Sequence, residues 1–130
     1  MAKSPARLGK MQLRIMQILW REGQATARQI TDELNRSEPV SHSTVQTLLR
    51  KMELKGALTH EENDRVFLFR PLYLQEEVAQ TAAHDLLTRV FDGSVYGVVS
   101  HFLKHETLSP EEKQRLRELI EQSNEEKRSR

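Results

Sequence analysis

Cysteine is absent from this 130-residue chain, which excludes disulfide bonds, thiolate zinc sites and cysteine nucleophiles. Glycine is sparse, and the five glycines are too scattered to form a loop that cradles a phosphate group. No apolar run reaches the length of about 18 residues that a membrane-spanning helix needs, so we expect no membrane insertion. Residues 1–10 also lack the apolar centre of a secretion signal. These absences lead us to expect a cytoplasmic protein.

Catalytic constellations are also missing from the sequence. No Ser–His–Asp set and no facing carboxylate pair stands out, so we predict a protein that is not an enzyme and has no cofactor. His101 and His105 have the i, i+4 spacing of metal ligands on a helix. A metal site needs a third ligand, for which the candidates are Glu106 and the distant His84. We predict no metal site, and a metal-triggered sensor is kept as an alternative.

Charge is unevenly distributed although the net charge is only +1. Residues 1–70 contain 12 Lys or Arg and 8 Asp or Glu, a balance of +4, whereas residues 71–130 contain 8 and 11, a balance of −3. A basic front half and an acidic rear half are typical of a nucleic-acid-binding module followed by a protein-contact module. The alternative is that the difference arises by chance.

Residues 40–56, VSHSTVQTLLRKMELKG, are the stretch around which the chain is organised. Apolar residues at i, i+3, i+4 and i+7 predict a helix with one buried stripe, formed by Val45, Leu48, Leu49 and Met52. Ser41 is placed as its N-cap and Gly56 as its C-terminal stop. The opposite side carries groups that can meet base edges and phosphates, on His42, Ser43, Gln46, Thr47 and Arg50. The stretch is therefore either a DNA-reading helix or a capped surface helix.

Two shorter helices are predicted before this stretch. The first covers residues 8–22, and residues 24–25 are expected to form a tight connection. Thr26 and Gln29 form a capping box that opens the second helix, and Pro39 blocks its continuation. Helix, short helix, turn and polar-faced helix is the helix-turn-helix order.

A two-stranded hairpin is predicted behind the polar-faced helix. Residues 61–64 have turn chemistry, and residues 65–70, RVFLFR, are rich in β-formers. Such a wing sets Arg65 near its tip, within reach of a phosphate or the minor groove. The alternative role for Arg65 is a cross-strand pair with Glu61 or Glu62.

The alternation along the second strand of this hairpin places Phe67 and Phe69 on one face. Aromatic side chains on a strand can stack on unpaired bases. Because no basic groove accompanies these two in the sequence, we predict that both pack in the core.

Three more helices are predicted after residue 74. One covers residues 75–91, a second begins after Ser94, and a third begins with the N-cap Ser109 and Pro110. Residues 121–130 are polar and are expected to be loose.

The apolar residues of these three helices exceed what the helices can bury among themselves. They are Leu86, Leu87, Val90, Phe91, Val95, Val98, Val99, Phe102, Leu103, Leu116, Leu119 and Ile120. We predict that they form a homodimer interface, which would also set two DNA-reading helices about 34 Å apart to match a palindromic operator. The alternative is a monomer whose rear half folds back on its front half.

Five blocks of the chain resemble the penicillinase-repressor family (BlaI/MecI). They are LRIMQILWREG, TARQITDEL, STVQTLLRKMELKGAL, RVFLFRP and FLKHETLSPEEKQRLRELI, and they occur in the family's order and spacing from about residue 8 to residue 120. The resemblance implies a winged-helix repressor that binds palindromic operators as a homodimer. It places the DNA-reading positions at residues 41–50 and the wing contact at Arg65. The predicted DNA contacts are Ser41, His42, Ser43, Thr44, Gln46, Thr47, Arg50 and Arg65.

The resemblance also implies a way of releasing DNA. Repressors of that family are inactivated by cleavage in the dimerisation domain when a membrane metalloprotease system is activated. The matching step here is His101–Phe102, and His101 departs from the Asn that family members carry before this Phe. A copper-responsive branch of the family has a cysteine-rich tail, which this chain lacks.

We therefore expect a mainly α fold with a small β-hairpin wing. Residues 8–71 would form a winged helix-turn-helix DNA-binding domain, and residues 72–125 a three-helix dimerisation domain. The expected function is a homodimeric transcriptional repressor that occludes a promoter, and the resemblance suggests a role in an antibiotic response. The alternatives are a winged-helix protein-interaction module without DNA binding and the metal-triggered sensor.

Overall fold

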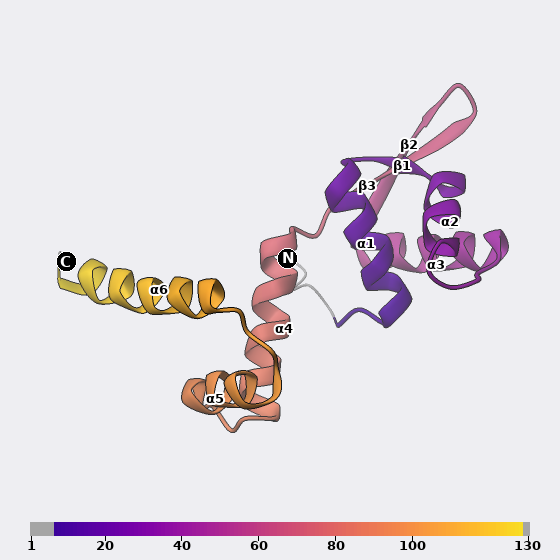
Figure 1. Ribbon diagram of the computed structural model, residues 1–130. Coiled ribbons are helices and arrows are strands. Elements are labelled where there is room, and N and C mark those ends of the chain that lie inside the picture. Colours follow the sequence, from indigo (N-terminus) through magenta and orange to yellow (C-terminus); the bar gives the residue numbers. More distant parts are fainter. Residues whose placement is uncertain (1–6, 129–130) are drawn as a thin grey trace. The chain divides into compact units, whose positions relative to one another are not determined.

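The computed structural model describes residues 7–128 and divides the chain into two compact units, residues 1–85 and residues 86–130. In chain order the elements are α1 (Lys10–Glu22), β1 (Ala25–Thr26), α2 (Ala27–Asn35), α3 (His42–Lys55), β2 (Leu58–Asn63), β3 (Val66–Pro71), α4 (Gln75–Arg89), α5 (Val95–His105) and α6 (Pro110–Arg128) (Figure 1). The fold is mainly α with one small antiparallel sheet, which confirms the predicted fold class.

The capped ends of α2 and α3 lie where the local chemistry of the sequence predicts them, whereas α1 begins at Lys10 rather than residue 8 and α4 ends at Arg89 rather than residue 91. At the start of α2, Thr26 Oγ1 accepts from the Gln29 backbone N–H at 3.1 Å, and Gln29 Oε1 accepts from the Thr26 N–H at 2.9 Å. At the start of α3, Ser41 Oγ accepts from the Thr44 N–H at 3.1 Å. Gly56 ends α3 with a φ of 85°, a left-handed conformation that glycine adopts without steric cost.

One hydrophobic core holds the first unit together. Its fully buried side chains come from α1, α2, α3 and β2. They are Ile15, Met16, Leu19, Ile30, Leu34, Val45, Leu49, Met52 and Leu58. Trp20 packs against this core, and its indole N–H donates to the Tyr73 carbonyl oxygen at 2.9 Å. Tyr73 is itself buried and Val78 packs on the same core. The compact unit extends to residue 85.

The sheet has three strands in the order β1-β3-β2. The sequence analysis did not predict β1. Ala25 pairs with Phe69 and Thr26 with Leu68, so the stretch expected to be only a tight connection also contributes a two-residue strand. This prediction was wrong because two residues show no alternation, and their partner lies more than 40 residues further along the chain. The extra strand anchors β3 to the start of α2.

The turn of the wing is tighter than predicted. Asn63 pairs with Val66, which leaves only Asp64 and Arg65 between the strands. Their φ angles are 51° and 67°, as a two-residue connection of type I′ requires. Residues 61–63, expected to belong to the turn, are part of β2 instead, because the closing pair sits at Asn63.

The second unit begins within α4 and contains α5 and α6. Ser94 Oγ accepts from the Gly97 N–H at 2.8 Å, and Ser109 Oγ accepts from the Glu112 N–H at 3.1 Å, so both predicted N-caps are confirmed. Helix α6 continues to Arg128, which corrects the prediction of a loose tail for the described part of residues 121–130. Glu, Gln, Arg and Lys dominate this extension, and all are good helix formers. Across residues 7–128, no helix combines the length and the apolar character needed to cross a membrane.

We predict that Leu49→Ala lowers the free energy of unfolding by about 2–5 kcal/mol, because it empties a fully enclosed core position. The matched control is Leu54→Ala on the same helix. Leu49 is 1% exposed and Leu54 is 82% exposed, so the control should change stability by no more than about 0.5 kcal/mol. Urea unfolding followed by the fluorescence of Trp20, the only tryptophan, measures both. Equal losses in the two variants would contradict the assignment of the inner face of α3.

Candidate nucleic-acid interface

Helix α3 presents two chemically different faces. Val45, Leu49 and Met52 are buried at 0%, 1% and 0% exposure. The exposed side carries Ser43, Gln46, Thr47 and Arg50, which follow the i, i+3, i+4, i+7 spacing of a single stripe along the helix. The polar stripe predicted from the sequence is therefore continuous and solvent-accessible.

Hydroxyl groups at the start of α3 are committed to local hydrogen bonds. Ser41 Oγ donates to Thr44 Oγ1 at 2.8 Å while accepting from the Thr44 N–H. Thr47 Oγ1 donates to the Ser43 carbonyl oxygen at 3.0 Å. Within the part of the chain that the structure describes, no hydrogen bond or ion pair engages the side chains of Gln46 and Arg50. The Gln46 amide and the Arg50 guanidinium can therefore use all their hydrogen-bonding atoms to bind a ligand.

His42 bridges α3 to α2. Its Nδ1 lies 3.0 Å from Thr31 Oγ1, and the Thr31 hydroxyl donates to the Ala27 carbonyl oxygen at 2.8 Å. The Thr31 hydroxyl thus links the start of α3 to the first turn of α2. The sequence left open whether His42 contacts DNA or only solvent, and this helix–helix contact was not foreseen.

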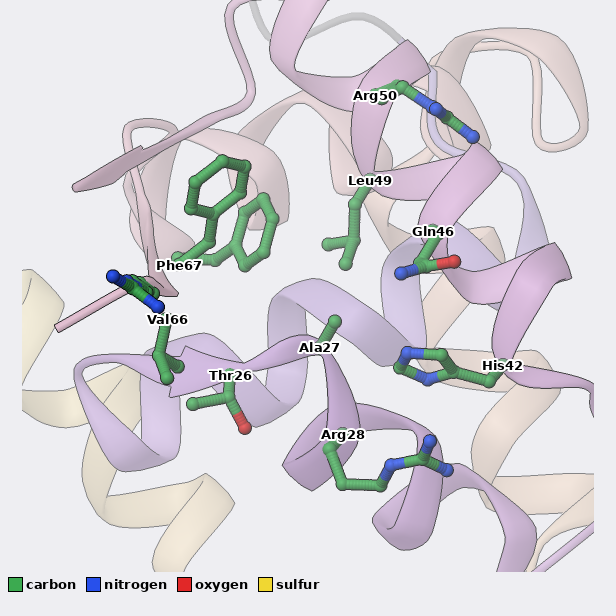
Figure 2. Close-up of a pocket in the computed structure, with 11 residues that line it drawn as sticks. Thr26, Ala27, Arg28, His42, Gln46, Leu49, Arg50, Val66 and Phe67 are labelled. Carbon is green, nitrogen blue, oxygen red and sulfur yellow. The ribbon is translucent and has the colours of Figure 1, made fainter. Parts of the chain in front are cut away.

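An open groove of about 480 Å³ separates α3 from the wing. Figure 2 shows Leu49 and Gln46 of α3 across the groove from Phe67 and Val66 of β3, with Ala27 of α2 between the two sides. The full lining is Thr26, Ala27, Arg28, His42, Gln46, Leu49, Arg50, Arg65, Val66, Phe67 and Phe69. It includes three arginines and no carboxylate, so the groove favours anions.

Arg28 is a site residue that the sequence analysis missed. It lies in the first turn of α2 and joins Arg50 and Arg65 around the groove. Among residues 7–128, none of these three arginines forms an ion pair. The sequence carried no local signal for it, because the residues that share the groove with Arg28 come from α3 and from the wing, whose positions in space the sequence does not give.

Arg65 sits at the tip of the wing, as predicted. The cross-strand alternative is not observed, because Glu61 pairs with Arg70 at 3.1 Å and no carboxylate of residues 7–128 lies within ion-pair distance of Arg65. The guanidinium is therefore available to a ligand. The backbone of Arg65 has a positive φ of 67°, which is unfavourable for a residue with a Cβ.

The two phenylalanines of β3 have different environments. Phe69 is 8% exposed and belongs to the core, but Phe67 is 45% exposed, so the prediction that both are core residues was wrong for Phe67. Phe67 lies further toward the wing tip, where the helices no longer cover the sheet. It stacks on His60 with ring centroids 4.3 Å apart, and His60 Nδ1 hydrogen-bonds Glu53 of α3. The wing is thereby tied to the C-terminal half of α3.

The predicted interface residues of the second unit are largely exposed. Val90, Val95, Leu119 and Ile120 are each more than 60% exposed, and none of the residues in α4, α5 or α6 is buried. Leu86, Val99, Phe102 and Leu103 are 39–48% exposed. The remaining members are half-buried, and they are Leu87, Phe91, Val98 and Leu116.

The histidine pair on α5 has the geometry expected from its spacing. The rings of His101 and His105 have centroids 4.4 Å apart. Within residues 7–128, no group of three or more His, Asp, Glu or Cys side chains gathers to hold a metal ion. His101 and Phe102 are both exposed, so the predicted cleavage step lies on the surface of α5.

Comparisons with known proteins agree with this geometry. The family model for the penicillinase repressor matches residues 8–122. The chain is 29% identical over 122 residues to the penicillinase repressor of Bacillus licheniformis, and the alignment covers 94% of each chain. The DNA-binding domain of the repressor BlaI, a solution structure, is similar with a TM-score of 0.52 and 28% identity, over 59% of this chain and 93% of that one. Monomeric BlaI of Bacillus licheniformis in complex with the blaP half-operator is similar with a TM-score of 0.50, the same identity and the same coverage.

We predict that Arg65→Gly leaves the free energy of unfolding unchanged or raises it by up to about 1 kcal/mol, because glycine relieves the left-handed backbone while losing more chain entropy. Arg70→Gly, the same substitution in the regular part of β3, should cost about 1 kcal/mol through weakened strand pairing and loss of the ion pair with Glu61. Chemical denaturation of both variants tests this. A larger loss at Arg65 than at Arg70 would show that the side chain of Arg65 serves the fold rather than a ligand.

Proposed function

The chain belongs to the penicillinase repressor family, and we propose that it is a homodimeric transcriptional repressor that binds a palindromic DNA operator and occludes a promoter. The observation that carries the proposal is α3, whose inner face is enclosed while its outer face presents the free groups of Gln46 and Arg50. The family is one of repressors rather than enzymes, in agreement with the prediction from the sequence.

In this proposal, residues 8–71 read the operator and residues 72–125 hold the dimer together. The outer face of α3 enters the major groove, where an arginine can bond guanine and a glutamine can bond adenine through paired hydrogen bonds. Monomeric BlaI of Bacillus licheniformis was solved with a half-operator, which supports a comparable role for this domain. Because its ligand is genomic DNA, the proposed location is the cytoplasm.

Arginines around the groove supply the sequence-independent part of the proposed binding. Arg28 at the start of α2 and Arg65 at the wing tip line the same groove beside α3. Neither is engaged by a carboxylate among the described residues, so neither loses an ion pair when it meets a phosphate. Phosphate contacts of this kind orient a protein on the duplex, and base contacts then select the sequence.

The proposed dimer rests on the exposed apolar residues of the second unit. Each large apolar side chain transferred from water to an interface contributes about 1.5–3 kcal/mol at full burial. Tyr96, at 83% exposure, adds to the surface formed by Val95 and Val99 on α5. A second copy covers the same surface on both protomers and places two copies of α3 on successive major grooves.

Release of the operator is proposed to follow cleavage at His101–Phe102 by a membrane metalloprotease system. In a single protomer both residues are exposed on α5, an 11-residue helix without buried side chains. Because Phe102 also belongs to the proposed dimer interface, the step is open to a protease when the protomers are apart. A helix of this kind opens locally at low cost, which is the condition for entry into a protease. Cleavage there would divide the proposed dimer interface between two fragments.

We expect Arg50→Ala and Thr47→Ala each to weaken operator binding by about 1–3 kcal/mol, as the loss of a base contact does. Gln17→Ala, an exposed position on α1, is the matched control and should leave affinity unchanged. A gel-shift titration with DNA upstream of the protein's own gene measures all three, and binding should fall steeply with added salt. Wild-type affinity in both α3 variants would remove this helix from the reading role.

Leu119→Asp is expected to convert the dimer into a monomer, because a carboxylate in an apolar interface carries a large desolvation penalty. Operator affinity should fall at least tenfold as one half-site is lost. Gln114→Asp, on another side of α6, serves as the control. Sedimentation equilibrium gives the oligomeric state of both variants, and a dimeric Leu119→Asp protein would place the interface elsewhere.

A further inference from the structure

The groove between α3 and the wing has an apolar part that DNA phosphates do not need. Figure 2 shows Phe67 and Ala27 in this part, with Arg28 and Arg50 nearby. Arg65 also lines the groove, and Leu49 closes it from the core side with only 1% of its surface exposed. Phosphate contacts satisfy guanidinium groups, but the sugar–phosphate backbone offers no flat apolar surface to cover an aromatic ring. Phe67 nevertheless remains 45% exposed here, within a groove of about 480 Å³.

These features together match a ligand with two parts. Small-molecule sites are concave and mostly apolar, with a few polar groups that fix the orientation of the ligand. A flat apolar body can pack against Phe67 and Ala27, and an acidic group can reach the guanidinium groups at the rim. No carboxylate lines the groove, so a ligand anion meets no repulsion there.

We propose that this groove binds a small aromatic acid, meaning a ring system of one or two rings that carries a carboxylate, sulfonate or phosphate group. The ring lies against Phe67, whose own ring stacks on His60. The acid pairs with the arginines. Polar substituents on the ring meet the Gln46 amide or the His42 imidazole, which also line the groove.

A bound acid would compete with operator DNA. Its anion engages guanidinium groups that the proposed function assigns to phosphates and bases, and its body fills the space between the reading helix and the wing. This regulatory consequence rests on the proposed function, whereas binding of the acid itself does not. The two are therefore measured separately.

Naphthalene-2-sulfonate is a suitable probe for the binding experiment. It is titrated into the ¹⁵N-labelled full-length protein without DNA, and backbone amide shifts are followed by NMR. The amides of Gln46, Arg50 and Phe67 should move with a single saturation curve. Neutral 2-naphthalenemethanol has the ring without the anion, and inorganic sulfate has the anion without the ring. Each should bind at least about fivefold more weakly than the probe.

Variants locate the site and separate its two parts. Arg65→Gln and Phe67→Ala should each weaken probe binding about threefold to fivefold, as losses of a partly exposed ion pair and of an aromatic contact do. Arg115→Gln and Leu54→Ala, which lie outside the groove, should not. Shifts confined to α4, α5 and α6, or equal binding of sulfate and the probe, would overturn the proposal. Unchanged binding in Arg65→Gln, a surface change that the fold should tolerate, would also overturn it.

Competition with DNA is measured by adding increasing concentrations of the probe to the protein bound to a fluorescently labelled operator. Displacement that is lost in Phe67→Ala would support competition in the groove. If the protein binds the probe in the groove but never binds the operator, the proposed function fails and the ligand site stands. If the operator binds normally and the NMR shifts in the groove are absent, the ligand site fails and the proposed function stands.

Discussion

Burial of the inner face of α3 is the constraint on which the rest of the structure depends. Val45, Leu49 and Met52 are enclosed by α1, α2 and β2, and this enclosure fixes the rotation of the helix about its own axis. Since the faces of a helix are rigidly related, placing Leu49 in the core determines where Gln46 and Arg50 point. The same apolar contacts that stabilise the unit therefore orient the side chains proposed to read DNA.

The wing is positioned by two further connections to this helix pair. The short strand β1 pairs with β3 immediately before α2 begins, so the base of the wing is joined to the helix-turn-helix. Closer to the tip, Glu53 of α3 bonds His60, and His60 stacks on Phe67. A hairpin alone is only marginally stable in water. These connections give the groove a defined shape, which both a duplex and a small acid require of their site.

The sequence predicted those features that have local chemical signals, and it missed those that arise from tertiary contacts. Thr26, Ser41 and Gly56 were recognisable because caps and left-handed stops act within a few residues. The strand at Ala25 carried no such signal, since its partner is remote in the chain. Alternation placed Phe67 and Phe69 on one face, but it does not tell which part of that face the helices cover. The groove and Arg28 emerged only once the wing was in place.

The proposed release mechanism follows from an unequal distribution of stability along the chain. The first unit has a closed core, whereas the second unit, formed by the end of α4 with α5 and α6, has no buried residue among those the structure describes. In a dimer, the stability of these helices would come from the partner, so cutting one segment would weaken the whole association rather than a single contact. Two half-sites bound together gain a large effective concentration, which disappears when the link is lost. A reading unit that stays folded can thus lose the operator without any change in its own α3.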